Sequence, residues 1–211
     1  MRSLCAVVFG LLLAACSKGD AGAPPPASAP VAEPGAAGAQ VALPPPGAFQ
    51  VDATHSTVLF KVKHANASYT YGWFKDLAGS FAIDADPKKS SVELTVQAAS
   101  IDTRDGERND HLAGPDFLNA KQFPELTFKS TSVEPAAGGW RVTGDLTIHG
   151  TTRSVTFTAV PVGDAKDPRG QRLVGVEAHL TIQRADFGVA FMPEMIGPDI
   201  ELTIALQGNA A

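Results

Sequence analysis

The alternation of apolar and polar residues at positions 56–64, the end of the stretch 49–64, limits most strongly what this chain can fold into. Every second residue, including Val58, Phe60 and Val62, faces one side, and mostly polar residues face the other. Leu59 is the exception on the polar side. A repeat of two residues is typical of a β-strand with one buried and one solvated face. The segment therefore predicts a single strand at the start of a sheet.

The same alternation returns in later segments, most clearly at 91–98 and 174–182. Short turn signals at 86–89, 138–139 and 149–152 separate these segments. The whole pattern predicts about eight or nine strands and no long helix. Such spacing indicates an all-β domain and leaves a sandwich and an up-and-down barrel as open alternatives.

One stretch, residues 104–119, breaks the alternation. It is polar and has no repeat of two, so we expect one or two short helical turns there. Phe117 and Leu118 are expected to pack against an end of the sheet. Farther along, Gly144 interrupts a strand pattern and predicts a bulge.

Charge and cysteine content exclude several classes of function. The chain has 211 residues and a net charge of -5, and the charges of the first 47 residues cancel. The folded part, 48–211, is therefore mildly acidic and has no run of Lys or Arg, which argues against a nucleic-acid partner. Cys5 and Cys16 both precede this domain. A disulfide, a cysteine metal cluster or a cysteine nucleophile within the domain is thus excluded.

The N-terminus has the pattern of a secretory signal. Arg2 is followed by an apolar run at 4–15 that is too short for a lasting membrane span. The run ends in Leu-Ala-Ala-Cys at 13–16, which resembles a bacterial lipobox. We therefore predict a signal peptide at 1–15 and a lipid on Cys16; cleavage after residue 15 of an ordinary signal peptide is the alternative. Ser17 favours the outer over the inner membrane.

Residues 16–47 are dominated by Ala, Pro and Gly and contain two Pro-Pro-Pro triplets. Such a segment has too little apolar surface to form a core of its own. It is predicted to be a disordered tether that begins at the lipidated Cys16. The predicted location is the bacterial cell envelope, with the domain facing the periplasm.

Several separated motifs of the domain resemble the YceI family. They follow the family's order: VDATHSTVLFKVKH at 51–64, GWF at 72–74, DFLNAKQFPELTFKS at 116–130, GDLTIHGTTRSVTF at 144–157 and RADFG at 184–188. The resemblance covers about residues 49–206. It implies a lipocalin-like antiparallel β-barrel of about eight strands with a short helical insertion. It also implies an isoprenoid lipid or the tail of a quinone as a ligand inside the barrel.

The candidate ligand-binding residues are apolar side chains on the inward face of the expected strands, one inward histidine, and large residues expected in loops at a barrel mouth. Trp73, Phe74, Phe187, Phe191 and Met192 belong to the loop group. The predicted binding set is Val58, Phe60, Val62, His64, Trp73, Phe81, Leu94, Val96, Phe128, Phe157, Leu180, Ile182, Phe187 and Phe191. The alternative is that these residues fill an ordinary core.

No motif for catalysis or metal binding stands out. The histidines lack the close spacing of a zinc site, and the chain has no GxSxG, Walker or Rossmann motif. Asp52 and His55 are expected to pin a strand end, with a metal or acid–base role as the alternative. Arg184 and Asp186 are expected to form a local ion pair that holds a strand end, with a contact to a ligand head group as the alternative. We therefore predict no enzyme activity, no metal and no cofactor other than the bound ligand.

The sequence leaves two functions open beside the alternative of an enzyme that uses Asp52 and His55, or His64. The first is a membrane-tethered binding protein that holds an isoprenoid lipid or quinone-type amphiphile for storage, transport or stress protection. The second is an envelope structural or interaction protein whose barrel is filled and binds no ligand. Strand-edge pairing into a homodimer is compatible with both functions.

Overall fold

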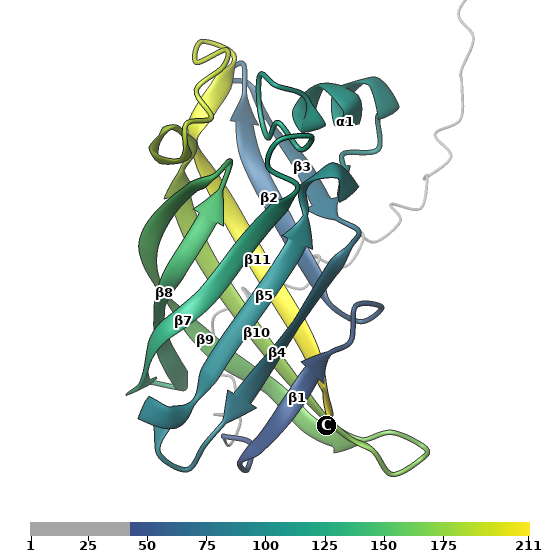
Figure 1. Cartoon of the computed structure of the whole chain (residues 1–211), viewed down its shortest axis with the longest axis vertical. Coiled ribbons are helices and arrows are strands. Elements are labelled where there is room, and N and C mark those ends of the chain that lie inside the picture. The colour runs from purple at the N-terminus through teal and green to yellow at the C-terminus, as the bar shows by residue number, and fades with distance from the viewer. Residues whose placement is uncertain (1–42) are drawn as a thin grey trace, which may run out of the picture. The chain divides into compact units, whose positions relative to one another are not determined.

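The computed structural model describes residues 43–211. The chain there forms an antiparallel sheet with one short α-helix and three 3-10 turns (Figure 1). The elements are β1 (Gly47–Val51), β2 (Thr57–His64), β3 (Ser68–Phe74), β4 (Leu77–Ile83), η1 (Pro87–Lys89), β5 (Ser91–Gln97), η2 (Ala98–Ser100), β6 (Ile101–Asp102), α1 (Gly106–Ala113), β7 (Glu125–Ala136), β8 (Gly139–Ile148), β9 (Thr151–Lys166), β10 (Arg172–Gln183), η3 (Arg184–Phe187) and β11 (Ile196–Ala210).

The sheet closes because β1 pairs with two strands, β4 on one side and β11 on the other. The closed ring contains eight strands in the order β1, β4, β5, β7, β8, β9, β10 and β11. Closure satisfies the backbone hydrogen bonds that an open sheet would expose at its edges. The predicted all-β barrel of about eight strands with a short helical insertion is confirmed, and a sandwich is excluded.

Strands β1 and β2 follow one another along β11. Residues 49–51 of β1 pair with 208–210, and β2 pairs with 196–205. The predicted strand at 56–64 is confirmed as β2, whereas β1 is a separate strand that the sequence did not predict, and residues 52–56 lie between the two. Here the Asp52 carboxylate accepts hydrogen bonds from the Thr54 backbone N–H and hydroxyl, which turns the chain out of the ladder.

The predicted alternation within β2 is confirmed. Val58, Phe60 and Val62 are buried, and the residues between them are more exposed. Phe60 lies opposite Leu202 in β11, so apolar residues of neighbouring strands meet on the same inner face. Burial of this face is the main stabilising term of the barrel.

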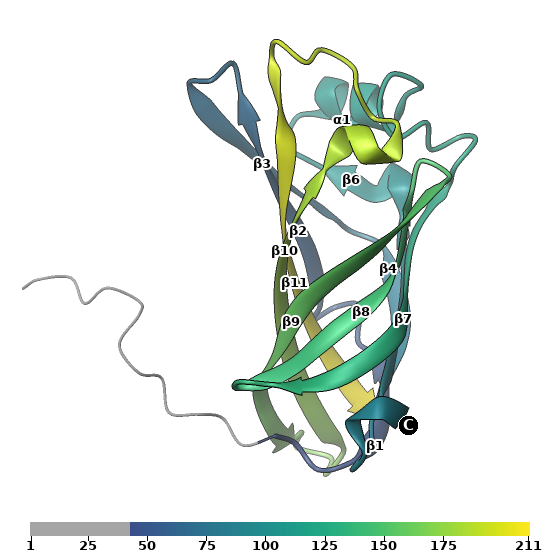
Figure 2. The same cartoon turned by 90° about the vertical axis from the view of Figure 1, so that its left-hand side faces the viewer.

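The two ends of the barrel differ in construction (Figures 1 and 2). We call the end where β1 begins and β11 ends the floor. We call the opposite end the mouth; it comprises the tip of the β2–β3 hairpin (64–68), α1 with the loop after it (114–124), and η3 with the loop after it (188–195). Figure 2 shows the β2–β3 hairpin leaning outward from the barrel at the mouth.

The floor contains a tightly packed apolar cluster. Phe49 and Val174 are 1% and 0% exposed, and the Phe49 ring stacks on Phe81 with centroids 5.1 Å apart. Gly208 leaves the space that these rings need: a Cβ at this position would lie 2.4 Å from the Phe81 ring. Such packing fills the space between β1, β4 and β10 at this end with side chains.

The helical insertion at the mouth forms where the sequence predicts it. Helix α1 is capped by Asp105, whose carboxylate accepts the backbone N–H of Arg108. Phe117 follows the helix and is buried, as predicted. Across the mouth, His149 and Gly150 have φ values of 52° and 71° and form the tight turn between β8 and β9.

The predicted bulge is present, but it lies in the strand opposite Gly144. Ser130 pairs with Gly144 and Ser132 with Thr143, so Thr131 of β7 is the extra residue. Gly144 has another role, because a Cβ there would lie 2.4 Å from the Phe128 ring. Within residues 43–211, no helix is both long and apolar enough to cross a lipid bilayer.

Candidate functional site

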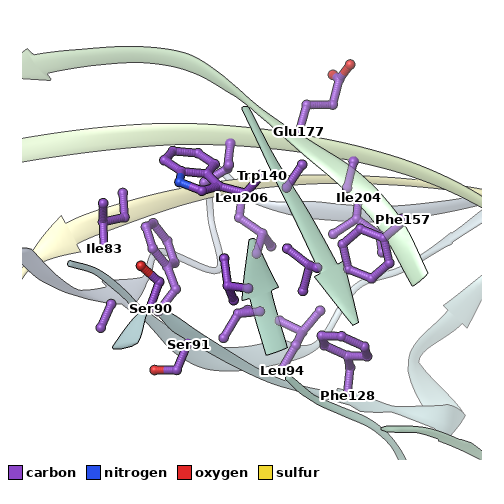
Figure 3. Close-up of a pocket in the computed structure, with 18 residues that line it drawn as sticks. Ile83, Ser90, Ser91, Leu94, Phe128, Trp140, Phe157, Glu177, Ile204 and Leu206 are labelled. Atoms are coloured by element: carbon purple, nitrogen blue, oxygen red, sulfur yellow. The ribbon is translucent and has the colours of Figure 1, made fainter. Parts of the chain in front are cut away.

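The barrel interior contains two apolar cavities, one toward the floor and one toward the mouth. The lower cavity has a volume of about 90 Å³ (Figure 3). It is lined by Phe81, Ala82, Ile83, Ser90, Ser91, Val92, Leu94, Phe128, Val133, Trp140, Val142, Phe157, Ala159, Val176, Glu177, Ala178, Ile204 and Leu206. Figure 3 shows that the Glu177 carboxylate points away from the cavity, so its interior surface is almost entirely hydrocarbon.

The upper cavity lies below the mouth and has a volume of about 170 Å³. It is lined by Phe60, Val62, Lys63, His64, Thr70, Phe74, Ile101, Arg108, Leu112, Phe117, Leu118, Leu126, Ile148, Ile182, Arg184, Phe187, Val189, Ile196, Ile200 and Leu202. Lys63, His64 and Arg108 are exposed to solvent. The cavity therefore reaches the surface beside the β2–β3 hairpin and α1.

The two cavities are arranged end to end, because successive inward positions of the same strands line first one and then the other. On β7, Leu126 lines the upper cavity and Phe128 the lower; on β11, Leu202 and Ile204 divide in the same way. Phe128 packs against both the upper apolar cluster and the cluster around Trp140. Its ring is therefore part of the partition between the cavities.

The buried Arg184 fixes the loop that closes one side of the mouth. Its guanidinium donates hydrogen bonds to the backbone carbonyls of Val189, Phe191, Ile196 and Gly197, at 2.9–3.0 Å. Burial lowers the pKa of Arg184. The predicted ion pair with Asp186 is wrong: Asp186 is exposed, and the arginine is held by backbone carbonyls instead.

A second arginine that lines the same cavity is also fixed by hydrogen bonds. Arg108 of α1 donates from Nε to the Thr103 hydroxyl at 2.7 Å and from a terminal nitrogen to the Thr103 carbonyl at 2.9 Å. Thr103 is itself buried and bonds the Asn109 side chain. The charged side chains that line the upper cavity, Lys63, Arg108 and Arg184, thus lie toward the mouth.

Nine of the residues predicted to bind a ligand line one of the two cavities. Phe60, Val62, His64, Ile182 and Phe187 line the upper cavity, and Phe81, Leu94, Phe128 and Phe157 line the lower. His64 is exposed at the upper rim, so it is a mouth residue and not a core histidine.

Five predicted residues line neither cavity. Val58 and Val96 are buried in an apolar cluster whose other members line either the upper or the lower cavity. Leu180 packs beside Ile182 and Phe187. The prediction that Trp73 and Phe74 lie in a loop is wrong, because both belong to β3. Trp73 lies opposite Leu59 on the outer face, whereas Phe74 lines the upper cavity. Phe191 is in a mouth loop, as predicted, but is exposed.

The sequence patterns missed the mouth residues that come from irregular segments. Leu112, Phe117 and Val189 lie on α1 or in loops, where no repeat of two exists to mark an inward side. Several lower-cavity residues, including Trp140 and Val142, could have been assigned, because their strand shows the expected alternation. Cys16 and the predicted signal peptide lie outside the described residues.

Asp52 and His55 form a polar cluster at the junction of β1 and β2, and neither lines a cavity. Asp52 Oδ2 lies 2.8 Å from His55 Nδ1 and also accepts hydrogen bonds from Gln207 and Asn209 of β11. These hydrogen bonds, with that from the Thr54 hydroxyl the strongest, hold the pKa of Asp52 far below its ordinary value. The cluster fastens β1 and β2 to β11.

Within residues 43–211, no group of three His, Cys, Asp or Glu side chains is placed to hold a metal ion. In the same range, every buried side-chain nitrogen or oxygen atom has a hydrogen-bond partner. The geometry of the described domain is therefore that of an apolar binding site with a polar entrance.

Comparisons with known proteins agree with this geometry. A model of the family described as the YceI-like domain matches residues 49–208. Protein YceI of Escherichia coli O17:K52:H18 is 37% identical over 155 residues, which cover 73% of this chain and 81% of that protein.

Solved structures show the same fold. BcnA of Burkholderia cenocepacia aligns with a TM-score of 0.68 and 28% identity, over 74% of this chain and 98% of BcnA. A domain from Saccharophagus degradans, described as a polyisoprenoid binding domain implicated in plant cell wall breakdown, aligns with a TM-score of 0.58 over 78% of this chain and 99% of that domain. At 16% identity, the second match shows the fold alone.

Proposed function

Because the chain belongs to the YceI-like domain family, we propose that its barrel binds one slender apolar amphiphile, an isoprenoid lipid or a quinone with an isoprenoid tail. The protein holds this ligand at a bacterial membrane, to which a lipid on Cys16 attaches it. The observation that carries the proposal is the end-to-end arrangement of two apolar cavities, the upper of which reaches the surface at the mouth.

The cavity dimensions suit a chain that enters one segment at a time. A cavity of about 150 Å³ lined by apolar side chains accommodates a molecule of benzene size in other proteins. The upper cavity, at about 170 Å³, thus suits a branched isoprene unit, and the lower cavity, at about 90 Å³, suits a narrower segment. A longer chain occupies both once the side chains between them move.

The distribution of polar groups sets the orientation of the ligand. Lys63, His64 and Arg108 border the upper cavity at the mouth, whereas the lower cavity is lined almost entirely by apolar side chains. A polar head group loses less hydration at the mouth than it would inside the hydrocarbon lining. The ligand therefore enters tail first, and its head group stays beside these side chains.

The test is native mass spectrometry of the full chain, expressed in a bacterial envelope and extracted in mild detergent. We expect one apolar species that remains bound through purification and is released only on unfolding. A clean ligand-free mass, with no uptake of added prenyl lipids or quinones, would contradict the proposal and favour a filled barrel that acts through its surface.

A matched pair of variants on one strand locates the site. Val62→Trp adds a large ring inside the upper cavity, and Leu59→Trp adds the same ring on the outer face of β2. We expect the first to lose ligand uptake and the second to retain it, with both folded by circular dichroism. Equal uptake by the two variants would exclude the upper cavity as the binding site.

The membrane attachment has its own test. Lipidation of Cys16 predicts that the mature protein fractionates with membranes and that its N-terminal peptide carries acyl mass. Cys16→Ser is expected to leave the protein outside the membrane fraction. A mature protein that begins at residue 16 without acyl mass would show that an ordinary signal peptidase removes the leader.

A further inference from the structure

The rim of the mouth carries an unusual number of exposed apolar side chains. Of the eight large hydrophobic residues that are exposed within residues 43–211, Phe191, Met192 and Met195 lie in the mouth, and Tyr69 and Tyr71 lie next to it, on the outer face of β3 after the hairpin tip. Tyr69 and Tyr71 are 50% and 58% exposed on β3, and the other three are about 40% exposed on the loop after η3. We call these five residues the apolar rim.

The apolar rim is continuous through contacts between its parts. The backbone N–H of Ala65, at the tip of the β2–β3 hairpin, donates to the Met195 carbonyl at 2.7 Å. On its other side, the Phe191 ring meets the Phe117 ring edge-on, with centroids 5.4 Å apart. The rim therefore runs from the hairpin along the 188–195 loop to the segment that follows α1.

The loop is built to hold these side chains outward. Arg184 bonds the Phe191 carbonyl, and the Met192 carbonyl accepts the backbone N–H groups of Met195 and Ile196. Met192 itself has a φ of 50°, a left-handed conformation that disfavours an ordinary side chain. The fold thus retains a strained residue whose side chain is exposed and apolar, which is typical of a binding surface.

We propose that the apolar rim docks on the surface of a lipid bilayer, so that the upper cavity opens directly onto the membrane. This inference rests on the proposed function, because an isoprenoid ligand has too little solubility in water to be supplied except from a bilayer or a partner. Tyr and Met side chains suit this interface, where one part of the side chain is apolar and another can face water.

The charges around the rim indicate apolar insertion and not electrostatic adsorption. Lys63 and His64 stand beside it, but so do Glu194 and Asp116, and Lys61 is already paired with Glu201 at 2.9 Å. A surface of mixed sign gains little from anionic lipids. We therefore expect docking on neutral lipid that changes little with salt.

The N-terminal chain is long enough for either end of the barrel to meet the membrane. The described chain enters at the floor, opposite the mouth (Figure 1). About 30 residues separate Cys16 from β1, and at about 3.3 Å per residue they reach at most about 100 Å. The 16 residues of β9, tilted as in an eight-stranded barrel, span roughly 40 Å along its axis. Attachment through Cys16 is thus compatible with a mouth that faces the bilayer.

The test compares two label positions on the full chain, mixed with vesicles of plain phosphatidylcholine that contain no isoprenoid. Met195→Cys places a polarity-sensitive fluorophore on the rim, and Val162→Cys places it on the floor half of β9 at an exposed apolar residue. Both label positions are placed in the Cys16→Ser chain, so that neither an acyl anchor nor a thiol at position 16 contributes. We expect quenching by nitroxide-bearing lipid at position 195 and none at 162, with little change between 0.1 and about 1 M salt.

A further variant measures the contribution of the rim. Met192→Ser in the Met195→Cys chain removes an exposed apolar side chain that lines neither cavity, and we expect about a five- to twenty-fold weaker partition into vesicles. Equal quenching at 195 and 162, or quenching at 162 alone, would overturn the proposal. Self-quenching between labelled copies without any lipid quenching would assign the rim to a second copy of the chain and also overturn it.

The docking and the proposed function can fail separately. Docking is measured without ligand, whereas ligand uptake is measured from vesicles that contain a prenyl lipid or quinone. Rim quenching without uptake would refute the binding function and leave the docking surface standing. Uptake with no quenching at position 195 would refute the docking surface and leave the binding function standing.

Discussion

The floor and the mouth of this barrel are made by opposite ends of the same strands, yet different forces hold them. At the floor, Phe49, Phe81 and Val174 form a tight apolar cluster. At the mouth, the 188–195 loop is held by hydrogen bonds from Arg184, and large apolar side chains face outward. The contrast indicates that the floor supplies stability, whereas the mouth can rearrange around a ligand without unfolding the barrel.

The largest expected effect is at the floor. Phe49→Ala removes a ring that is 1% exposed and stacked on Phe81, and it should lower the free energy of unfolding by about 3–5 kcal/mol. Urea denaturation measures this change. Phe49→Leu serves as the control, because it keeps most of the buried volume and should lose clearly less.

Ligand uptake per folded molecule should be unchanged in both Phe49 variants, because Phe49 lines neither cavity. If uptake fell in parallel with stability, the floor and the mouth would form one cooperative unit, and the proposed division of roles would be wrong.

A somewhat smaller effect is expected from Arg184→Met at the mouth. The four carbonyls that Arg184 bonds would lose their partner, at a cost of about 2–4 kcal/mol. Hydrogen exchange should accelerate across residues 188–196 and stay slow at Val174 of the floor. Arg184→Lys has fewer donors in a less suitable geometry and should recover only part of the protection.

Uniform acceleration of exchange, with Val174 as affected as the mouth loop, would show that Arg184 stabilises the whole barrel and not one end. This outcome would remove the basis for treating the 188–195 loop as a separate unit.

The regular part of the molecule could be predicted from sequence, and the irregular part could not. Alternation along β2 identifies Phe60 and Val62 correctly, because a strand in a closed sheet has only an inner and an outer side. Alternation does not show which inward residues border empty space. Val58 and Phe60 have the same pattern, but the first is packed and the second lines a cavity, since the outcome depends on side chains from distant strands.

The roles of Arg184 and of Leu112 show the second limit. Each depends on where a loop or helix folds back over the barrel end, and no local repeat encodes this. The sequence RADFG at 184–188 is a family motif. Within it, the neighbouring Asp186 suggests an ion pair with Arg184 more readily than hydrogen bonds from Arg184 to four backbone carbonyls.

The Phe128 side chain separates the cavity toward the mouth from the cavity toward the floor. Phe128 packs against apolar clusters above and below it, and its ring lies 5.3 Å from that of Phe157. Phe128→Val should join the two cavities, shift the bound species toward longer prenyl chains, and cost about 1–2 kcal/mol of stability. Competition between prenyl alcohols of different length, read by mass spectrometry, measures this shift.

Val142→Ala is the control for Phe128→Val, because it enlarges the lower cavity while the Phe128 ring is kept. It should leave the preferred chain length unchanged. The same shift in both variants would mean that total volume, and not the partition, sets the chain length.

The smallest expected effect concerns Asp52, at the junction of β1 and β2. The Asp52 carboxylate bonds Thr54 and residues of β11, which lowers its pKa in the folded state. A lowered pKa stabilises the fold above the ordinary aspartate pKa of about 3.9, and this contribution falls as the pH decreases below that value. Asp52→Asn should therefore unfold at a lower temperature than wild type at pH 7, and the difference should shrink below about pH 4. A difference that persists unchanged in acid would show that the shape of the side chain, and not its charge, fastens β1 and β2 to β11.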